Sequence, residues 1–394
     1  MMPILLKAKW LIDGTGRAPI ANGRVLVADG VIAAVGEPNN VPTPPGIQVL
    51  DIGDGTLLPG LIDVHSHLSL DMSRGDVEAQ LKEQESDRLI RGVEILRRNL
   101  KAGITTMRLC GESRNFIDVT CKRAVEDGRL YGPRLLVSGK ALSPSHGHGV
   151  SAGVDGVEDV RLAVRQNIRA GADLIKILVT GGIAGKHESP FSYFYSPEEI
   201  TVTVEEAHRA GKRVAAHAHG GPGLRYCLEV GVDTIEHGAY VSNEDIALFI
   251  EKKTWLVATF GVIFHPDGLE RAFAHVPYIV QKVHHARKDV DCNIKNAIDA
   301  GVRYTLGTDS MQGRMAFEIE HLVGLGVKPL DAIVAATKNA AECCGLESRT
   351  GTLEPGKWAD IISVLGNPLD DITALERIHL VMKAGQRYDQ ISFP

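Results

Sequence analysis

The chain has 394 residues, 44% of them hydrophobic and 23% charged, and its formal net charge is -6. This length allows one large core with a satellite domain, or about two to three ordinary domains, and the mild acidity gives no support for a nucleic-acid partner. No apolar run reaches roughly 18 residues, so no membrane-spanning helix is expected. Six scattered cysteines without a Cys-x-x-Cys pair indicate reduced thiols in a cytoplasmic protein.

Residues 1–56 have the pattern of a small β domain. Short β-branched runs occupy 25–27, 31–35 and 47–51, and Asp29-Gly30 between the first two is typical of a hairpin turn. The opening segment, 1–14, carries two lysines inside its apolar stretch, which favours an edge strand over a secretory signal.

From residue 57 to 352, short apolar runs alternate with amphipathic stretches of helical length. The runs predicted as strands are 61–67, 105–110, 134–138, 174–180, 213–219, 234–237, 255–260 and 303–309. Helices are predicted over 158–170 and 197–210, the second with Ser196 as N-cap and Pro197 in its first turn. This alternation predicts an α/β fold, a (β/α)₈ TIM-like barrel; the alternative, an open doubly wound sheet, lacks a Gly-x-Gly-x-x-Gly fingerprint.

After residue 352 the β pattern returns, with strands predicted at 358–364 and 379–383. We expect these strands to complete a small β-sandwich domain with the first segment. The predicted organisation is therefore a sandwich built from 1–56 and 353–394 around a barrel of residues 57–352.

Imidazole and carboxylate groups gather at the ends of the predicted barrel strands. They are His65, His67, His217, His219, His237 and Asp309. Each one alone is more readily explained as a hydrogen-bonded core histidine or a helix cap. Together, at the barrel end where functional side chains collect, they predict a divalent metal site with zinc as the expected ion.

Lys176 lies in the middle of the apolar run 174–178. An unpaired ammonium group is costly in such a place, so one interpretation is a lysine paired with a buried carboxylate. The other is that carbon dioxide has carbamylated the amine, which turns a buried cation into an anionic, bidentate ligand able to bridge two metals. Burial favours the neutral amine that this reaction needs.

Several short motifs occur in order at the strand ends: LPGLIDVHSH, LIKI, AAHAHG, IEHG and GTDS, followed by LEPGKWADI. With these motifs the chain resembles the amidohydrolase superfamily over nearly its whole length. Its motifs are most similar to the subgroup of Xaa-Pro and Xaa-Arg dipeptidases, imidazolonepropionase-like proteins and ochratoxin-type amidases.

The resemblance implies a binuclear metal centre and assigns its ligands. Its implied ligands are His65, His67 and Asp309 for one metal, His217 and His237 for the other, and carbamylated Lys176 bridging both. A metal-bridging hydroxide would attack the substrate, Asp309 would act as general base and then general acid, and His219 would help to polarise the scissile carbonyl.

Candidate substrate contacts lie in three loops. His146 and His148 follow the third strand, Tyr193 and Tyr195 follow the fourth, and Arg314 follows the eighth. A flexible loop, packed aromatic rings and a surface salt bridge are the plainer interpretations of these residues. The loops at 182–190 and 310–314 also depart from the familiar subgroup pattern, so dipeptidase activity does not transfer directly.

The sequence thus predicts a metal-dependent hydrolase, an amidase or peptidase that cleaves the C–N bond of a dipeptide, an N-acyl amino acid or a similar small amide. The alternatives are hydrolysis of a cyclic amide, carbamate or urea, deamination of a heterocycle, and a non-enzymatic metal-binding scaffold. The expected partner is a small-molecule or dipeptide substrate, with neither nucleic acid nor membrane, and the resemblance implies a homo-oligomer.

Overall fold

Eight parallel strands form the centre of the computed structural model, which describes residues 3–111, 115–149, 153–185 and 188–389. They are β8 (Leu61–Ser66), β9 (Ile104–Leu109), β10 (Arg134–Val137), β11 (Leu174–Leu178), β12 (Arg213–Gly220), β13 (Thr234–Tyr240), β14 (Trp255–Ala258) and β15 (Tyr304–Leu306). One sheet has the order β10-β9-β8 and the other runs from β11 to β15 in chain order. Every predicted strand of this region is present. Most are buried along their whole length, as parallel strands covered on both faces are.

Backbone hydrogen bonds bring the two sheets together at both seams. The amide of Asp309, just after β15, donates to the carbonyl of His65 in β8 at 2.8 Å. At the other seam the amide of Leu142 donates to the carbonyl of Lys176 at 2.8 Å, and the Leu178 amide donates back to Leu142 at 2.9 Å. The ladders found among the described residues stop at these seams, so full closure of the barrel stays a prediction.

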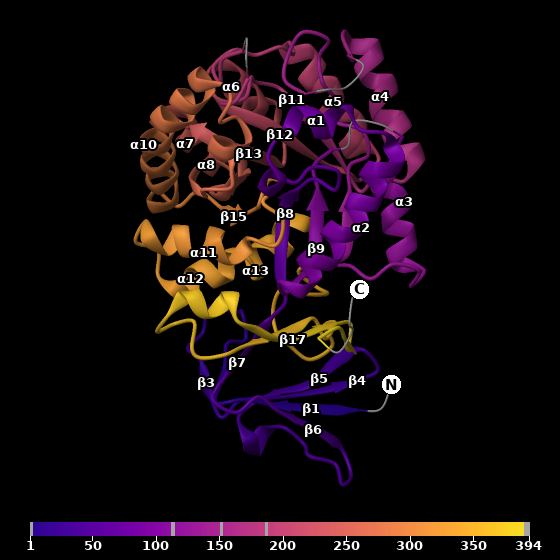
Figure 1. Ribbon diagram of the computed structural model, residues 1–394, viewed down its shortest axis with the longest axis vertical. Coiled ribbons are helices and arrows are strands. Elements are labelled where there is room, and N and C mark those ends of the chain that lie inside the picture. Colours follow the sequence, from indigo (N-terminus) through magenta and orange to yellow (C-terminus); the bar gives the residue numbers. More distant parts are fainter. Residues whose placement is uncertain (1–2, 112–114, 150–152, 186–187, 390–394) are drawn as a thin grey trace.

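Helices surround these strands on the outside (Figure 1). The longer ones are α2 (Glu85–Lys101), α3 (Ile117–Glu126), α4 (Val157–Ala170), α5 (Pro197–Arg209), α6 (Gly221–Val230), α7 (Asn243–Lys252), α10 (Pro277–Asp299), α11 (Met315–Gly324), α12 (Pro329–Ala335) and α13 (Lys338–Cys344). The predicted start of α5 is confirmed, because the Ser196 hydroxyl accepts from the Glu199 amide and the Glu199 carboxylate accepts from the Ser196 amide. Within the described residues, none of the helices combines the length and apolar character that crossing a bilayer requires.

Two further sheets lie at one end of the molecule, one built from the N-terminal segment alone and one from both chain ends (Figure 1). The first has the order β5-β4-β1-β6, with β1 (Ile4–Lys7), β4 (Arg24–Ala28), β5 (Val31–Gly36) and β6 (Gln48–Asp51). The second has the order β18-β17-β16-β7-β2-β3, with β2 (Trp10–Leu11), β3 (Ile20–Ala21), β7 (Thr56–Pro59), β16 (Ile361–Val364), β17 (Ile378–Lys383) and β18 (Gln386–Arg387). Apolar residues of both sheets share one buried cluster. A face-to-face sandwich stays a prediction.

Two details of this region differ from the prediction, and one agrees with it. The edge-strand assignment of the opening segment is wrong, because β1 pairs with β4 on one side and β6 on the other. Strand β7 pairs with β16 and β2, so residues 57–59 of the predicted barrel belong to the terminal sheet. The hairpin at Asp29-Gly30 is confirmed. Both residues have positive φ, 49° and 81°, as a two-residue turn between β4 and β5 requires.

Candidate metal centre

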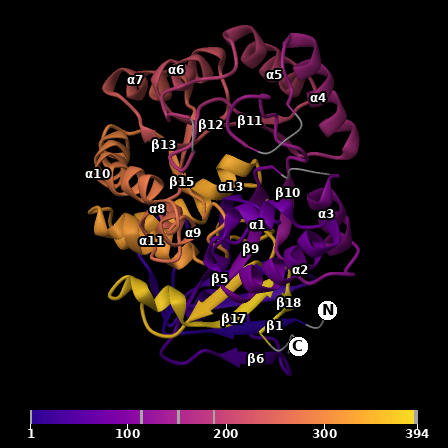
Figure 2. The same ribbon diagram turned by 45° about the horizontal axis from the view of Figure 1, so that its top comes forward.

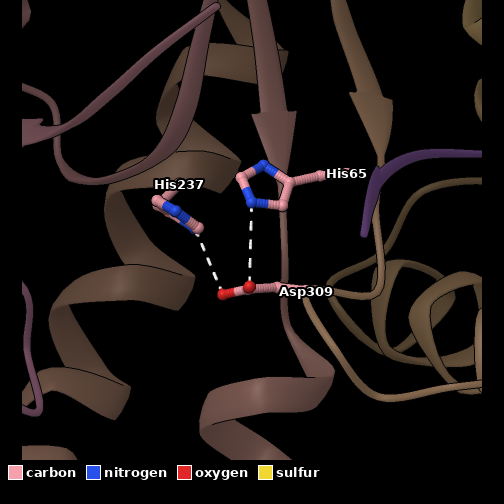
Figure 3. Close-up of side chains that lie close together, drawn as sticks. All are labelled: His65, His237 and Asp309. Atoms are coloured by element: carbon pink, nitrogen blue, oxygen red, sulfur yellow. Dashed lines mark ion pairs between the residues drawn. The ribbon is translucent and has the colours of Figure 1, made fainter. Parts of the chain in front are cut away.

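Three side chains meet where β8, β13 and β15 end (Figure 3). The ligand atoms of His65, His237 and Asp309 all lie within 4.8 Å of one another. Asp309 Oδ1 is 3.3 Å from Nε2 of His67 and 3.7 Å from Nε2 of His65, and its Oδ2 is 3.8 Å from Nδ1 of His237. The separations between these donors leave room for a cation among them.

The backbone is unusual at this point. His237, Asp309 and Ser310 have positive φ values of 74°, 43° and 71°, which residues with a side chain adopt only rarely. Neighbours in a regular strand point to opposite faces. The positive φ of His237 breaks that alternation, so Glu236 and His237 both lie against His65. Such backbone strain is typical of functional sites.

A second group of side chains lies beside the first. The His217 ring is 4.6 Å from that of His237 and 4.8 Å from that of His219, measured between ring centroids. Lys176, His217 and His219 are buried, and among the described residues Lys176 Nζ, His217 Nε2 and His219 Nδ1 have no hydrogen-bond partner. Buried polar atoms normally have partners. Unpartnered nitrogens such as those of His217 and Lys176 are available as metal ligands, so these residues fit the implied metals.

Burial sets the protonation of the histidines. It lowers the pKa of His65 to about 4, with the nearby Lys176 adding to the effect, and it lowers the pKa of His219 to about 3. Burial likewise holds the pKa values of His217 and His237 well below the ordinary range. All four imidazoles are therefore neutral at pH 7, which is the form that binds metals.

Burial acts to raise the pKa of Asp309, but the hydrogen bond from His67 and the nearby charge of Lys176 are among the interactions that outweigh it and hold that pKa below the ordinary value. The adjoining turn is fixed by Asp63, whose carboxylate accepts from the Thr308 amide at 3.0 Å and the Thr308 hydroxyl at 2.6 Å. Burial raises the pKa of Asp63 to about 7. Asp309 is thus ionised, and its backbone is held by a neighbouring acid.

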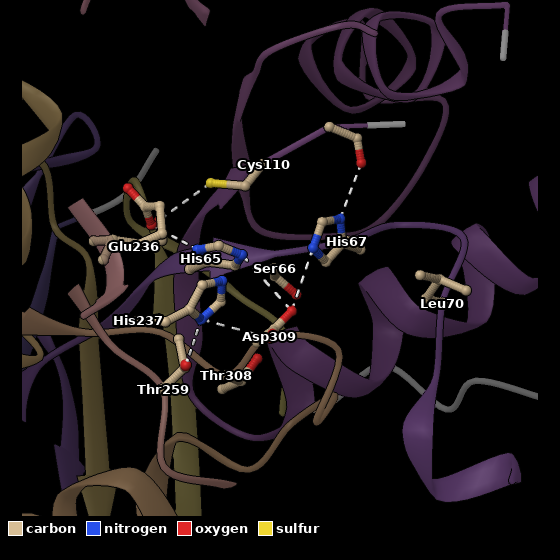
Figure 4. Close-up of polar contacts among 12 residues, drawn as sticks. His65, Ser66, His67, Leu70, Cys110, Glu236, His237, Thr259, Thr308 and Asp309 are labelled. Carbon is tan, nitrogen blue, oxygen red and sulfur yellow. Dashed lines mark hydrogen bonds and ion pairs between the residues drawn. The ribbon is translucent and has the colours of Figure 1, made fainter. Parts of the chain in front are cut away.

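A buried ion pair between Glu236 and Arg108 supports the site, and Figure 4 shows Glu236 beside His65. Glu236 accepts from Nδ1 of His65 at 2.6 Å and from Nη2 of Arg108 at 2.8 Å. The Thr234 hydroxyl also donates to Glu236. Because Nδ1 of His65 is engaged by the carboxylate, its Nε2 is left as the lone-pair donor that faces Asp309. Burial raises the pKa of nearby Cys110 to about 12, so in the metal-free protein this residue is a neutral thiol.

The predicted substrate contacts separate into one residue at the cavity and four elsewhere. His148 lines the cavity, stacks on His217 at 4.3 Å and has Nδ1 3.0 Å from Oε1 of Glu188. The other four do not line the cavity. His146 is exposed and packs on Phe194, and Tyr193 packs on Tyr226. Tyr195 is fully buried and its hydroxyl donates to the Val154 carbonyl, while Nη2 of Arg314 lies 3.9 Å from Oδ2 of Asp267. Of the five, His148 remains the candidate for substrate contact.

Sequence reasoning missed three residues that belong to this site. Glu236 and Arg108 orient His65, and Glu188 orients His148. The sequence did contain a sign of the first two, because Arg108 and Glu236 each place a charged side chain inside a short apolar run that was predicted as a strand. Two opposite charges buried in neighbouring parts of one fold need each other as partners. Glu188 gave no such signal, because polar residues are common in loops.

Comparisons with known proteins agree with this site. A model of the amidohydrolase family matches residues 56–388. Ochratoxinase of Aspergillus niger is 32% identical over an alignment 422 positions long, which covers 94% of this chain and 83% of that protein. Imidazolonepropionase of Symbiobacterium thermophilum is 25% identical and covers 89% of this chain and 85% of its own length.

Solved structures are similar along the whole chain. A Xaa-Pro dipeptidase with methionine bound in its active site matches with a TM-score of 0.88 and 29% identity, over 98% of this chain and 99% of that one. Structural neighbours such as this dipeptidase imply a TIM-barrel α/β fold for the parallel strands and helices that hold the site. The relatives are hydrolases, and the family model spans most of the sequence. This chain is a hydrolase that belongs to the amidohydrolase family.

Proposed function

We propose that the protein is a metal-dependent amidohydrolase that cleaves the C–N bond of a small amide. One observation carries the proposal: the unpartnered, buried nitrogens of Lys176, His217 and His219 face the same cavity as the carboxylate of Asp309. No apolar core needs these groups, and each would destabilise the fold unless a ligand satisfied it.

The proposed ligand set has two halves. His65, His67 and Asp309 would hold one divalent ion, and His217 and His237 would hold the other. Lys176, as a carbamate, would bridge the two. This assignment accounts for the chemistry of the donor set, because neutral imidazole and carboxylate oxygen are the ligands that zinc and similar ions prefer.

Bound divalent ions would lower the pKa of a coordinated water toward about 7 and polarise the scissile carbonyl. Asp309 would act as general base and then general acid: it takes a proton from the attacking water and gives it to the leaving nitrogen. A C–O bond forms, the C–N bond breaks, and the products are a carboxylic acid and an amine. His219 is the proposed hydrogen-bond donor to the carbonyl oxygen.

The names of two relatives support an amide substrate, since one is an ochratoxinase and the other a Xaa-Pro dipeptidase. Dipeptides and N-acyl amino acids are therefore the first substrates to test. Cyclic amides, carbamates, ureas and amino-substituted heterocycles complete the panel, because hydrolysis or deamination of these compounds is the competing outcome.

The decisive experiment loads the protein with zinc and ¹³C-bicarbonate. We expect two zinc ions per chain and a ¹³C carbamate resonance that is absent from Lys176→Met. A matched variant, Lys282→Met, changes a lysine that bonds loop carbonyls outside this ligand set and should keep both signals. A protein with full zinc occupancy, no carbamate resonance and no turnover of any amide in the panel would refute the proposal.

A further inference from the structure

The cavity beside the candidate metal centre has two chemically different sectors. Its volume is about 340 Å³, which suits a small molecule. The apolar sector lies over the ends of β14, β15 and β8, and its lining includes Met72, Val77, Val262, Ile263, Leu269 and Phe273. The polar sector lies over the ends of β10 and β11. It contains Ser143, His148 and Glu188, with the apolar side chains of Leu178, Ile183 and Ala184 beside them.

The apolar sector is built from two segments that follow distant strands. Helices η2 (Met72–Arg74) and α1 (Val77–Lys82) follow β8, while α8 (Gly261–Phe264) and α9 (Leu269–Ala272) follow β14. Helix α9 packs against η2, close to α1 (Figure 2). All residues of 67–83 and 261–273 are described. The polar side chains among the lining of this sector are the neutral hydroxyls of Ser69 and Ser310.

Buried polar contacts hold both walls of the apolar sector in place. The carboxylate of Glu318 accepts from the amides of Phe260 at 2.6 Å and Gly261 at 2.7 Å, at the start of α8. A Cβ on Gly261 would lie 2.6 Å from Glu318 Oε1, so this close approach requires glycine. On the other wall, the Met72 amide donates to the Ser310 carbonyl at 3.1 Å. A wall fixed in advance loses little entropy when a ligand binds.

The polar sector is equally well defined. Oε1 of Glu188 lies 3.0 Å from Nδ1 of His148, and Oε2 of Glu188 accepts from the Gly182 amide at 3.2 Å. A Cβ on Gly182 would lie 2.4 Å from the His148 ring, so glycine makes room for that ring. The polar sector therefore adds a carboxylate and an imidazole to its apolar lining, whereas the polar side chains of the other sector are two neutral hydroxyls.

The position of Asp309 determines which sector the amine portion of an amide substrate faces and which sector the acyl portion faces. It follows β15, between the two walls of the apolar sector, and in the proposed reaction it protonates the leaving nitrogen. The nitrogen and its substituent must therefore lie on the apolar side. We infer that the substrates are small amides with an apolar amine portion, aromatic or branched alkyl, and a short or polar acyl portion that faces His148 and Glu188. This inference rests on the proposed amidase function.

Two isomeric amides test this orientation on the metal-loaded enzyme. N-benzylacetamide carries its ring on the amine portion, and N-methyl-2-phenylacetamide carries the same ring on the acyl portion. We expect a higher kcat/KM for N-benzylacetamide. Leu269→Ala should lower that kcat/KM about tenfold, because groups of this size contribute such factors in apolar pockets, and should change the value for the isomer less than about twofold. Leu162→Ala, an exposed leucine on α4, is the matched control and should change neither.

A crystal soak tests the same point without turnover. N-(4-bromobenzyl)methanesulfonamide is not hydrolysed, and its bromine gives an anomalous signal. In the metal-loaded native protein we expect the bromine between η2 and α9. A bromine beside His148, or an empty cavity at saturating ligand, would overturn the inference, as would a preference for the acyl-side isomer. Failure of the proposed function is distinct from this, because then no amide of any kind would be hydrolysed.

Discussion

Changing Glu236 to glutamine should weaken metal binding without removing any metal ligand. The native carboxylate accepts two hydrogen bonds, from His65 Nδ1 at 2.6 Å and from Arg108 Nη2 at 2.8 Å. A glutamine of the same shape has one oxygen and one NH₂ group. If its oxygen faces Arg108, the NH₂ group faces His65, which must then move its proton to Nε2. If its oxygen faces His65, its NH₂ group faces the Arg108 guanidinium, and two hydrogen-bond donors then meet without an acceptor.

The expected size of the effect follows from each outcome. A proton on Nε2 of His65 removes the lone pair that faces Asp309, and loss of such a supporting partner typically lowers metal affinity about 10- to 100-fold, or about 1.4–2.7 kcal/mol. Breaking a fully buried ion pair also costs about 3–5 kcal/mol of folding free energy. We expect a loss of folding free energy at the lower end of this range, because glutamine keeps the shape of the side chain and one of its two hydrogen bonds.

Zinc dissociation constants, measured by competition with a chromophoric chelator, check the first effect, and thermal melting of the metal-free protein checks the second. Glu206→Gln is the matched control, because Glu206 binds three arginines on the helices and lies far from the centre in the fold. It should reduce stability and leave zinc affinity unchanged. Zinc affinity within twofold of native in Glu236→Gln would refute the reasoning.

Asp309→Asn should remove turnover while circular dichroism shows a folded chain, and near-native kcat would exclude Asp309 as the proton carrier. Gly182→Ala should displace the His148 ring and lower kcat/KM about tenfold or more, whereas Gly324→Ala, where an added Cβ meets open space, should change nothing. Chelation of bound zinc should lower the melting temperature, by the equivalent of about 2.7 kcal/mol if free zinc had stood at 100 times its dissociation constant. The hydrogen bond from Arg165 leads the interactions that lower the pKa of Glu206 to about 2, from 4.5. A depressed carboxyl pKa stabilises the folded state fully above the unfolded pKa and progressively less as the pH falls to the folded pKa. The destabilisation by Glu206→Gln in urea melts should therefore be full at pH 7 and shrink between about pH 4.5 and 2.

Sequence patterns predicted the parallel strands well and selected candidate ligands that the fold brings close together, for a physical reason. Parallel strands are buried on both faces, so they appear as short apolar runs, and a donor at the end of such a run has few structural explanations. His65 and His67 could be placed together because strand alternation gives them the same direction. The topology of the fold then brought Asp309 beside them, although it lies more than 240 residues later in the chain.

The missed features depend on geometry that the sequence pattern does not carry. Strand alternation predicts that Glu236 points away from His237. His237 instead has a positive φ of 74°, which a histidine rarely adopts and which the alternation pattern does not predict. The apolar sector comes from short helices after β8 and β14, whose apolar residues resemble ordinary core. Tyr195 was proposed for the pocket because it lies in a loop, but its hydroxyl found a backbone carbonyl in the interior instead.

The pairing of the two chain ends has a consequence for biosynthesis. The hydroxyl of Thr56, in β7, donates to the carbonyl of Gly366, which the ribosome adds 310 residues later. At about 5–20 residues per second, β7 waits roughly 15–60 s for its neighbour β16 to emerge. During that interval an unpaired strand edge is open to other nascent chains. Translation that stalls before Ile361 should therefore yield aggregates, even when every residue of the metal centre has already been made.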